Sequence, residues 1–115
     1  MPNAHDTCKA SSTQACFDYS DPDTLAYFKA VAEYYVKQYG IDGWRLDQSY
    51  QVPVEAWNTI RTAVENAAAA RASAGETWGT LGYMVGEDWN SQDNIAITTY
   101  GTVSVPGLKS AFDFP

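Results

Sequence analysis

The sequence predicts an α/β fold with a parallel sheet. Two long stretches with helical periodicity alternate with short apolar stretches, and two of the short stretches end in a carboxylate, at Asp47 and Glu87. Helices that alternate with strands are typical of a parallel sheet, because each helix returns the chain to the end where the next strand starts. The chain of 115 residues, 45% of them hydrophobic, has room for one modest core.

The first helix is expected over residues 22–39. Asp21 suits the N-cap, Pro22 the first helical position, and Gly40 the stop after the last turn. The polar residues 1–20 lack periodicity, so we expect an N-terminal loop there and a folded domain over residues 21–115. The apolar stripe of the helix recurs at steps of three and four residues and comprises Leu25, Phe28, Val31, Ala32, Tyr35, Val36 and Tyr39.

A strand is expected at residues 41–47, followed by a second helix at about 53–72. Further strands are expected at 81–87 and 111–114, which makes three parallel strands in all. Between the last two, Ile95–Ile97 fits either a helical turn or a strand. The apolar side of the second helix comprises Val54, Trp57, Ile60, Ala63, Val64 and Ala67.

Composition argues against several classes of partner. The net charge of −7 disfavours nucleic acid, because phosphate binding needs a basic surface. No apolar run is long enough to cross a bilayer, so no membrane partner is expected. Residues 1–5 lack the basic start and apolar core of a signal peptide, so secretion is not supported and the location stays unknown.

The two cysteines, Cys8 and Cys16, lie in the polar N-terminal stretch. They would close a short disulfide loop in an oxidising compartment, and they would be free thiols in a reducing one. No matching set of cysteines and histidines stands elsewhere, since His5 is the one histidine, so no metal site is expected.

Asp47 is the first candidate for chemistry. Side chains alternate along a strand, so Arg45 and Asp47 share one face, and the cation favours the ionised carboxylate that a nucleophile needs. A purely structural ion pair is the alternative interpretation. If the two strands are neighbours, Asp47 and Glu87 end about 4.8 Å apart. Carboxyl groups about 5 to 5.5 Å apart are typical of retaining glycoside hydrolases. The adjacent Asp88 is expected to be solvated.

Four short motifs then carry a family resemblance. The stretch Asp42–Asp47 resembles the fourth-strand motif of the α-amylase family, glycoside hydrolase family 13, and Gly86–Trp89 resembles its fifth-strand motif. The segment Ala15–Tyr19 is similar to the motif that precedes the family's third helix, and Phe112–Pro115 is similar to its sixth-strand opening. The resemblance extends from about Gln14 to the last residue.

The resemblance implies a partial (β/α)8 barrel that spans roughly strands 4 to 6. It makes Asp47 the nucleophile, Glu87 the general acid/base and Arg45 the orienting cation of a retaining enzyme that acts on α-glucans or maltooligosaccharides. Eight tyrosines and four tryptophans are many for this length, and sugar-binding clefts use such rings. Trp89 and Tyr50 are therefore expected to contact the sugar, with core packing as the alternative for most aromatic residues.

The sequence also departs from the family pattern. It lacks the seventh-strand Asp and both histidine motifs. Many amylases carry Lys-His three and four residues after the nucleophile, for substrate and calcium, where this chain has Tyr50 and Gln51. Calcium is therefore not expected, no other cofactor is implied, and the chain alone is expected to be inactive or weakly active. Family members are often extracellular or periplasmic.

A partial barrel leaves strand edges and the inner face of its sheet without cover. We therefore expect self-association into a homo-oligomer that completes the fold. The alternative function is a non-catalytic, self-assembling α/β module with at most weak carbohydrate binding through Trp44, Tyr50, Tyr83 and Trp89.

Overall fold

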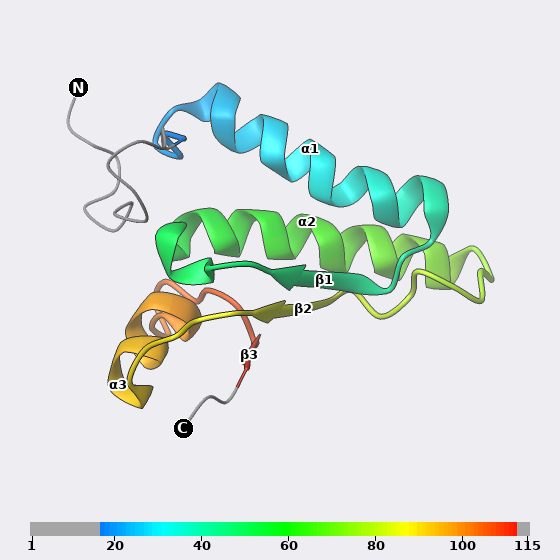
Figure 1. The fold of residues 1–115 in the computed structure, drawn as a ribbon. Helices are drawn as coiled ribbons and strands as arrows, with labels where there is room; N and C mark the ends of the chain where they lie inside the picture. Colours follow the sequence, from blue (N-terminus) through cyan, green and yellow to red (C-terminus); the bar gives the residue numbers. More distant parts are fainter. Residues whose placement is uncertain (1–16, 113–115) are drawn as a thin grey trace.

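The computed structural model describes residues 17–112, so Cys8, Cys16, His5 and the sixth-strand motif beyond Phe112 lie outside the described residues. The chain folds as two long helices, a small sheet and a short helical segment near the C-terminal end (Figure 1). In chain order the elements are α1 Pro22–Tyr39, β1 Gly43–Leu46, the 3-10 turn η1 Ser49–Gln51, α2 Val54–Ser73, β2 Tyr83–Gly86, α3 Gln92–Ile95, the π-helix η2 Ala96–Tyr100 and β3 Ser110–Ala111.

Helix α1 begins and ends as the sequence predicts, and α2 lies one residue later than expected at each end. The side chain of Asp21 accepts a hydrogen bond from the backbone N–H of Asp23 and another, 2.9 Å long, from the hydroxyl of Thr24. Gly40 has a φ of 64° and donates its N–H to the carbonyl of Val36, which ends α1 in a left-handed turn. The segment around Ile95–Ile97, which the sequence left open, is helical.

The sheet is parallel with the strand order β1-β2-β3, which confirms the predicted fold class. Strands β1 and β2 are shorter than expected, and residues 113–114 of the third expected strand lie outside the described residues. Residues 41–42 and 81–82 stay outside the strands, because Gly40 ends α1 in a left-handed turn and Gly82 has a φ of 62°. Asp42 instead fixes the loop before β2, since its side chain accepts the N–H groups of Gly79 and Thr80 at 2.9 and 3.3 Å.

The core lies between the sheet and the two long helices, which cover the same side of the sheet (Figure 1). Trp44 and Leu46 of β1 pack against this core, and the indole N–H of Trp44 donates to the carbonyl of Ala32 at 3.1 Å. Within residues 17–112 the other face of the sheet is open, and Tyr83 is 53% exposed there. The buried core residues are Ala32, Val36, Trp57, Ile60, Val64, Ala67, Ala68, Met84 and Leu108. Within residues 17–112, no helix is both long and apolar enough to cross a membrane.

Charged contacts fasten the C-terminal part of the chain to α2. Glu65 pairs with Arg61 at 2.9 Å and with Lys109 at 2.7 Å, and the guanidinium of Arg61 donates to the carbonyl of Gly107 at 2.6 Å. Burial alone would raise the pKa of Glu65, but the hydrogen bonds and charges of Lys109 and Arg61 lower it overall. These contacts hold the chain that leads into β3 against the helix.

The pairing of β1 with β2 requires glycine at position 43. A Cβ atom there would lie 1.7 Å from the carbonyl oxygen of Tyr83, so the two strands would have to separate. We predict that Gly43→Ala lowers the free energy of unfolding by about 3 kcal/mol or more, measured by urea unfolding followed by circular dichroism.

Gly75→Ala is the matched control. Nothing lies within 4 Å of a Cβ at this position, although φ is +82°, so only the left-handed backbone opposes the change. Its cost is expected to be about 1 kcal/mol. Equal losses for the two variants would contradict the close approach of β1 to β2.

Candidate active site

The register of β1 and β2 brings the two predicted carboxylates together. Leu46 is paired with Gly86, and the N–H of Glu87 donates to the carbonyl of Leu46 at 2.8 Å. Asp47 and Glu87 are the next residues of their strands, and parallel strands end at the same edge of the sheet. Both carboxylates therefore lie at the C-terminal edge of the sheet, where α/β folds usually place their ligands.

Arg45 bridges the two carboxylates. Its guanidinium lies 3.0 Å from Oδ1 of Asp47 and 2.8 Å from Oε2 of Glu87. The Arg45–Asp47 ion pair that sequence spacing suggested does form, and Arg45 contacts Glu87 as well. The side chain of Glu87 is 12% exposed and that of Asp47 69% exposed, so Glu87 is the more enclosed partner.

Four groups lower the pKa of Glu87. The largest cause is a hydrogen bond with the Asp47 side chain, and the next is the indole N–H of Trp89, which donates to Oε1 at 2.9 Å. The backbone N–H of Gln48 and the charge of Arg45 act in the same direction, while partial desolvation opposes them. Glu87 is therefore held in its ionised form.

A buried serine fixes the loop that follows β1. Ser49 is fully buried, and both its backbone N–H and its hydroxyl donate to the carbonyl of Glu87, at 2.8 and 3.2 Å. The carbonyl of Ser49 accepts the indole N–H of Trp57 at 2.8 Å. Gly86 makes room for this contact, because a Cβ there would lie 2.5 Å from the serine hydroxyl. Sequence reasoning missed Ser49, since nothing in its polar neighbourhood indicates burial.

The expectation that Asp88 is solvated is wrong. This side chain is fully buried and accepts hydrogen bonds from the hydroxyls of Thr98 and Thr99, at 2.6 and 2.8 Å, and from the amide of Asn90. The extended chain after β2 turns alternate side chains to opposite sides, so Asp88 points inward while Glu87 and Trp89 share the open side.

No family model matches the chain. A cyclomaltodextrinase from Bacillus sp is 39% identical over 57 residues, which are 50% of this chain and 10% of that protein. A maltogenic alpha-amylase from Bacillus acidopullulyticus is 29% identical over 99 residues, which are 85% of this chain and 17% of that protein. The crystal structure of AmyP in complex with maltose superposes with a TM-score of 0.71 at 47% identity and covers 83% of this chain.

This chain belongs to the α-amylase family and corresponds to one segment of its proteins. It corresponds to 20% of the AmyP chain, and a second AmyP structure, of a glutamate-to-glutamine variant in complex with maltotriose, matches with a TM-score of 0.72. The resemblance drawn from the motifs is thereby confirmed, as is the partial-barrel interpretation of the fold. The chain spans no more than about a fifth of the length of these relatives.

Tyr50 and Trp89, the two predicted sugar contacts, follow the same strand ends that carry Asp47 and Glu87. Trp89 is 63% exposed, with its indole N–H on Glu87. Tyr50 lies half-buried in the 3-10 turn η1, three residues after Asp47. In the part of the chain that the structure describes, no three His, Cys, Asp or Glu side chains gather closely enough to hold a metal ion.

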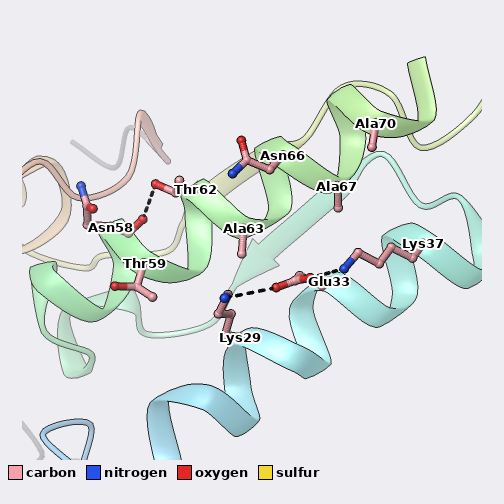
Figure 2. Close-up of a pocket in the computed structure, with 10 residues that line it drawn as sticks. All are labelled: Lys29, Glu33, Lys37, Asn58, Thr59, Thr62, Ala63, Asn66, Ala67 and Ala70. Carbon is pink, nitrogen blue, oxygen red and sulfur yellow. Dashed lines mark hydrogen bonds and ion pairs between the residues drawn. The ribbon is translucent and has the colours of Figure 1, made fainter. Parts of the chain in front are cut away.

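A groove on the helical side of the segment is separate from these residues. Figure 2 shows it between α1 and α2, with a volume of about 610 Å³. Glu33 lies between Lys29 and Lys37 and pairs with both, so one carboxylate faces two ammonium groups in the groove. None of the predicted site residues lines it; the lining comprises Lys29, Glu33, Lys37, Asn58, Thr59, Thr62, Ala63, Asn66, Ala67 and Ala70.

The contacts of Glu87 generate a prediction about its titration. Arg45→Gln removes the bridging charge, so the pKa of Glu87 should rise toward its ordinary value, as measured by carboxyl-carbon NMR. A lowered pKa in the folded state stabilises the fold above the ordinary value and loses that effect as the pH falls through the folded value. The carboxyl group of Glu87 should therefore titrate at higher pH in the variant, and its ionised form should stabilise the fold less.

Lys37→Gln is the matched control, because it removes one positive charge from α1, where Lys37 pairs with Glu33. It should leave the Glu87 titration unchanged. An unchanged Glu87 pKa in Arg45→Gln would show that the 2.8 Å contact with Arg45 does not control this carboxyl group.

Proposed function

We propose that this segment carries the two reacting carboxylates of an α-glucan hydrolase that retains anomeric configuration. Asp47 is the nucleophile and Glu87 is the general acid/base. The observation that carries the proposal is the pairing of Leu46 with Gly86, which sets the two acids side by side at the C-terminal edge of the sheet with Arg45 between them. Such a pair of carboxylates on adjacent strands is what retaining glycosidic hydrolysis uses.

The proposed reaction has two displacement steps. The Asp47 carboxylate attacks the anomeric carbon while Glu87 gives its proton to the departing glycosidic oxygen, which leaves a glycosyl ester on Asp47. Glu87, now ionised, takes a proton from water as the water oxygen attacks the anomeric carbon and releases Asp47. The two inversions restore the starting configuration, and Glu87 ends protonated as it began.

The isolated segment is poorly prepared for the first step. A general acid needs its proton near the working pH, whereas the contacts of Glu87 lower its pKa. The chain alone is therefore inactive or weakly active.

The proposed substrate is an α-glucan or a maltooligosaccharide. Support comes from the AmyP structures, which are complexes with maltose and maltotriose. In this chain the exposed ring of Trp89 stands beside Glu87, where a sugar ring can stack on it while the glycosidic oxygen faces the acid. Tyr50 flanks the nucleophile from the following turn.

A chimera tests the roles of the two acids. Residues 17–112 would replace the matching segment of AmyP, which supplies the rest of a barrel. We expect the chimera to cleave maltooligosaccharides, and Asp47→Asn or Glu87→Gln to lower kcat by about 10⁴-fold or more, because each removes a reacting group. Proton NMR of the first product should show the α-anomer.

The control is Glu55→Gln, which neutralises an exposed acid in the first turn of α2 and should leave kcat unchanged. A β-anomeric first product would overturn the retaining mechanism. Full activity of Asp47→Asn would overturn its assignment as nucleophile.

A second candidate function is self-assembly without catalysis, with at most weak carbohydrate binding. Helices α1 and α2 cover one side of the sheet, and on the other side Arg45 and Tyr83 are exposed. Strands β1 and β3 stand at the two edges of the described sheet. A second copy would cover this face and pair these edges, which parallel sheets normally require.

Light scattering after gel filtration tests the assembly. We expect a defined oligomer, and Tyr83→Lys should shift it to the monomer mass, because a lysine on the open face cannot be buried without a partner charge. Tyr27→Lys, at a 63% exposed position on α1, is the control and should keep the parental mass. A monomeric parent chain with an intact circular dichroism spectrum would contradict self-assembly.

A further inference from the structure

Asp88 is the one fully buried acid among residues 17–112, and the proposed reaction does not use it. We propose that Asp88 is a positioning residue, which anchors the chain after β2 to the helical segment α3–η2 and thereby orients Glu87 and Trp89 toward the sugar. The inference rests on the proposed function for the role of Glu87, and on the contacts of Asp88 for the anchor itself.

The anchor is built from neutral donors. The hydroxyl of Thr99 is fully buried and donates to Oδ2 of Asp88 at 2.8 Å, and the amide of Asn90 donates to Oδ1. The hydroxyl of Thr98 lies 2.6 Å from Oδ2 and 2.7 Å from the carbonyl of Asn94, so its single proton serves one acceptor at a time. Within the described residues no cation pairs with Asp88, so these donors replace the water that burial removes.

The segment that holds the anchor is itself fixed. The carbonyl of Thr99 accepts the N–H of Leu108 at 2.9 Å, and the carbonyl of Tyr100 accepts that of Gly107 at 2.8 Å. Ile95 of α3 and Leu108 are both buried. Asp88 is therefore tied to a rigid part of the fold, and an acceptor-only carboxylate is suited to two hydroxyls and an amide at once.

Position 88 controls the direction of its neighbours. With Asp88 turned inward, Glu87 and Trp89 point to the open side, where the indole N–H of Trp89 reaches Oε1 of Glu87 at 2.9 Å. On the other flank, Ser49 holds the carbonyl of Glu87 through two hydrogen bonds. The backbone at Glu87 is thus held by Ser49 and by the Asp88 anchor. Removal of the anchor leaves only the Ser49 contacts.

The test uses NMR on the full chain without sugar, so its result does not depend on whether the chain binds or cleaves glucan. In Asp88→Asn the indole N–H of Trp89 should exchange with solvent about three- to tenfold faster, because its hydrogen bond to Glu87 is weakened. Trp89→Phe assigns this signal among the four tryptophans. Thr99→Val removes a donor without changing the net charge and should have the same effect.

The titration of Glu87 separates orientation from simple electrostatics. Removing the negative charge of Asp88 would by itself lower the pKa of Glu87, whereas losing the Trp89 hydrogen bond raises it. We expect a rise in both Asp88→Asn and Thr99→Val. The exposed Asp93→Asn, on α3, carries the same charge change and should produce no rise.

A folded Asp88→Asn with unchanged indole exchange, or with a lowered Glu87 pKa, would overturn the positioning role. If Asp88→Asn fails to fold by circular dichroism, Thr99→Val decides the matter, because it removes the 2.8 Å donor to Oδ2 and keeps the charge of Asp88. An unchanged indole exchange rate in that variant would equally overturn the proposal.

Discussion

The parallel pairing of β1 with β2 is the constraint on which the candidate site depends. Asp47 and Glu87 are forty positions apart in the sequence and meet only because Leu46 is opposite Gly86. A register shift by one residue would turn every side chain of β1 to the other face of the sheet. Arg45 would then enter the core, and Trp44 would leave it. Burial of Trp44 and Leu46 under the helices therefore secures the position of the acids.

Hydrogen bonds and ion pairs, in addition to the apolar core, hold the segments around the site together. Ser49 joins the loop after β1 to the backbone of Glu87, and Trp57 joins the same loop to α2. Glu65, Arg61 and Lys109 join α2 to the chain before β3. Each of these contacts links segments that are distant in the sequence, so the site is held by the layers around it more than by its own loop.

Much of the fold and of the candidate site could be predicted from the sequence. Helix α1 was predicted to the residue because Asp21, Pro22 and Gly40 each carry local chemistry that sets a helix end. Strands β1 and β2 were predicted too long, since the hydrophobicity of Ile41 and Leu81 does not reveal the backbone geometry of Gly40 and Gly82. Asp88 was misjudged because its partners Thr98 and Thr99 come ten and eleven positions later, and only the folded chain brings them near. Burial that arises from tertiary contacts leaves no local pattern.

The connection between the two acid-bearing strands also has a consequence for the order of folding. Helix α2, from Val54 to Ser73, shortens the chain between β1 and β2 with contacts between near neighbours in the sequence. Closing the same gap with a disordered segment would require ordering a long loop before any strand contact could compensate. We therefore expect Asp47 and Glu87 to meet late in folding, after the helix has formed and the strands have paired.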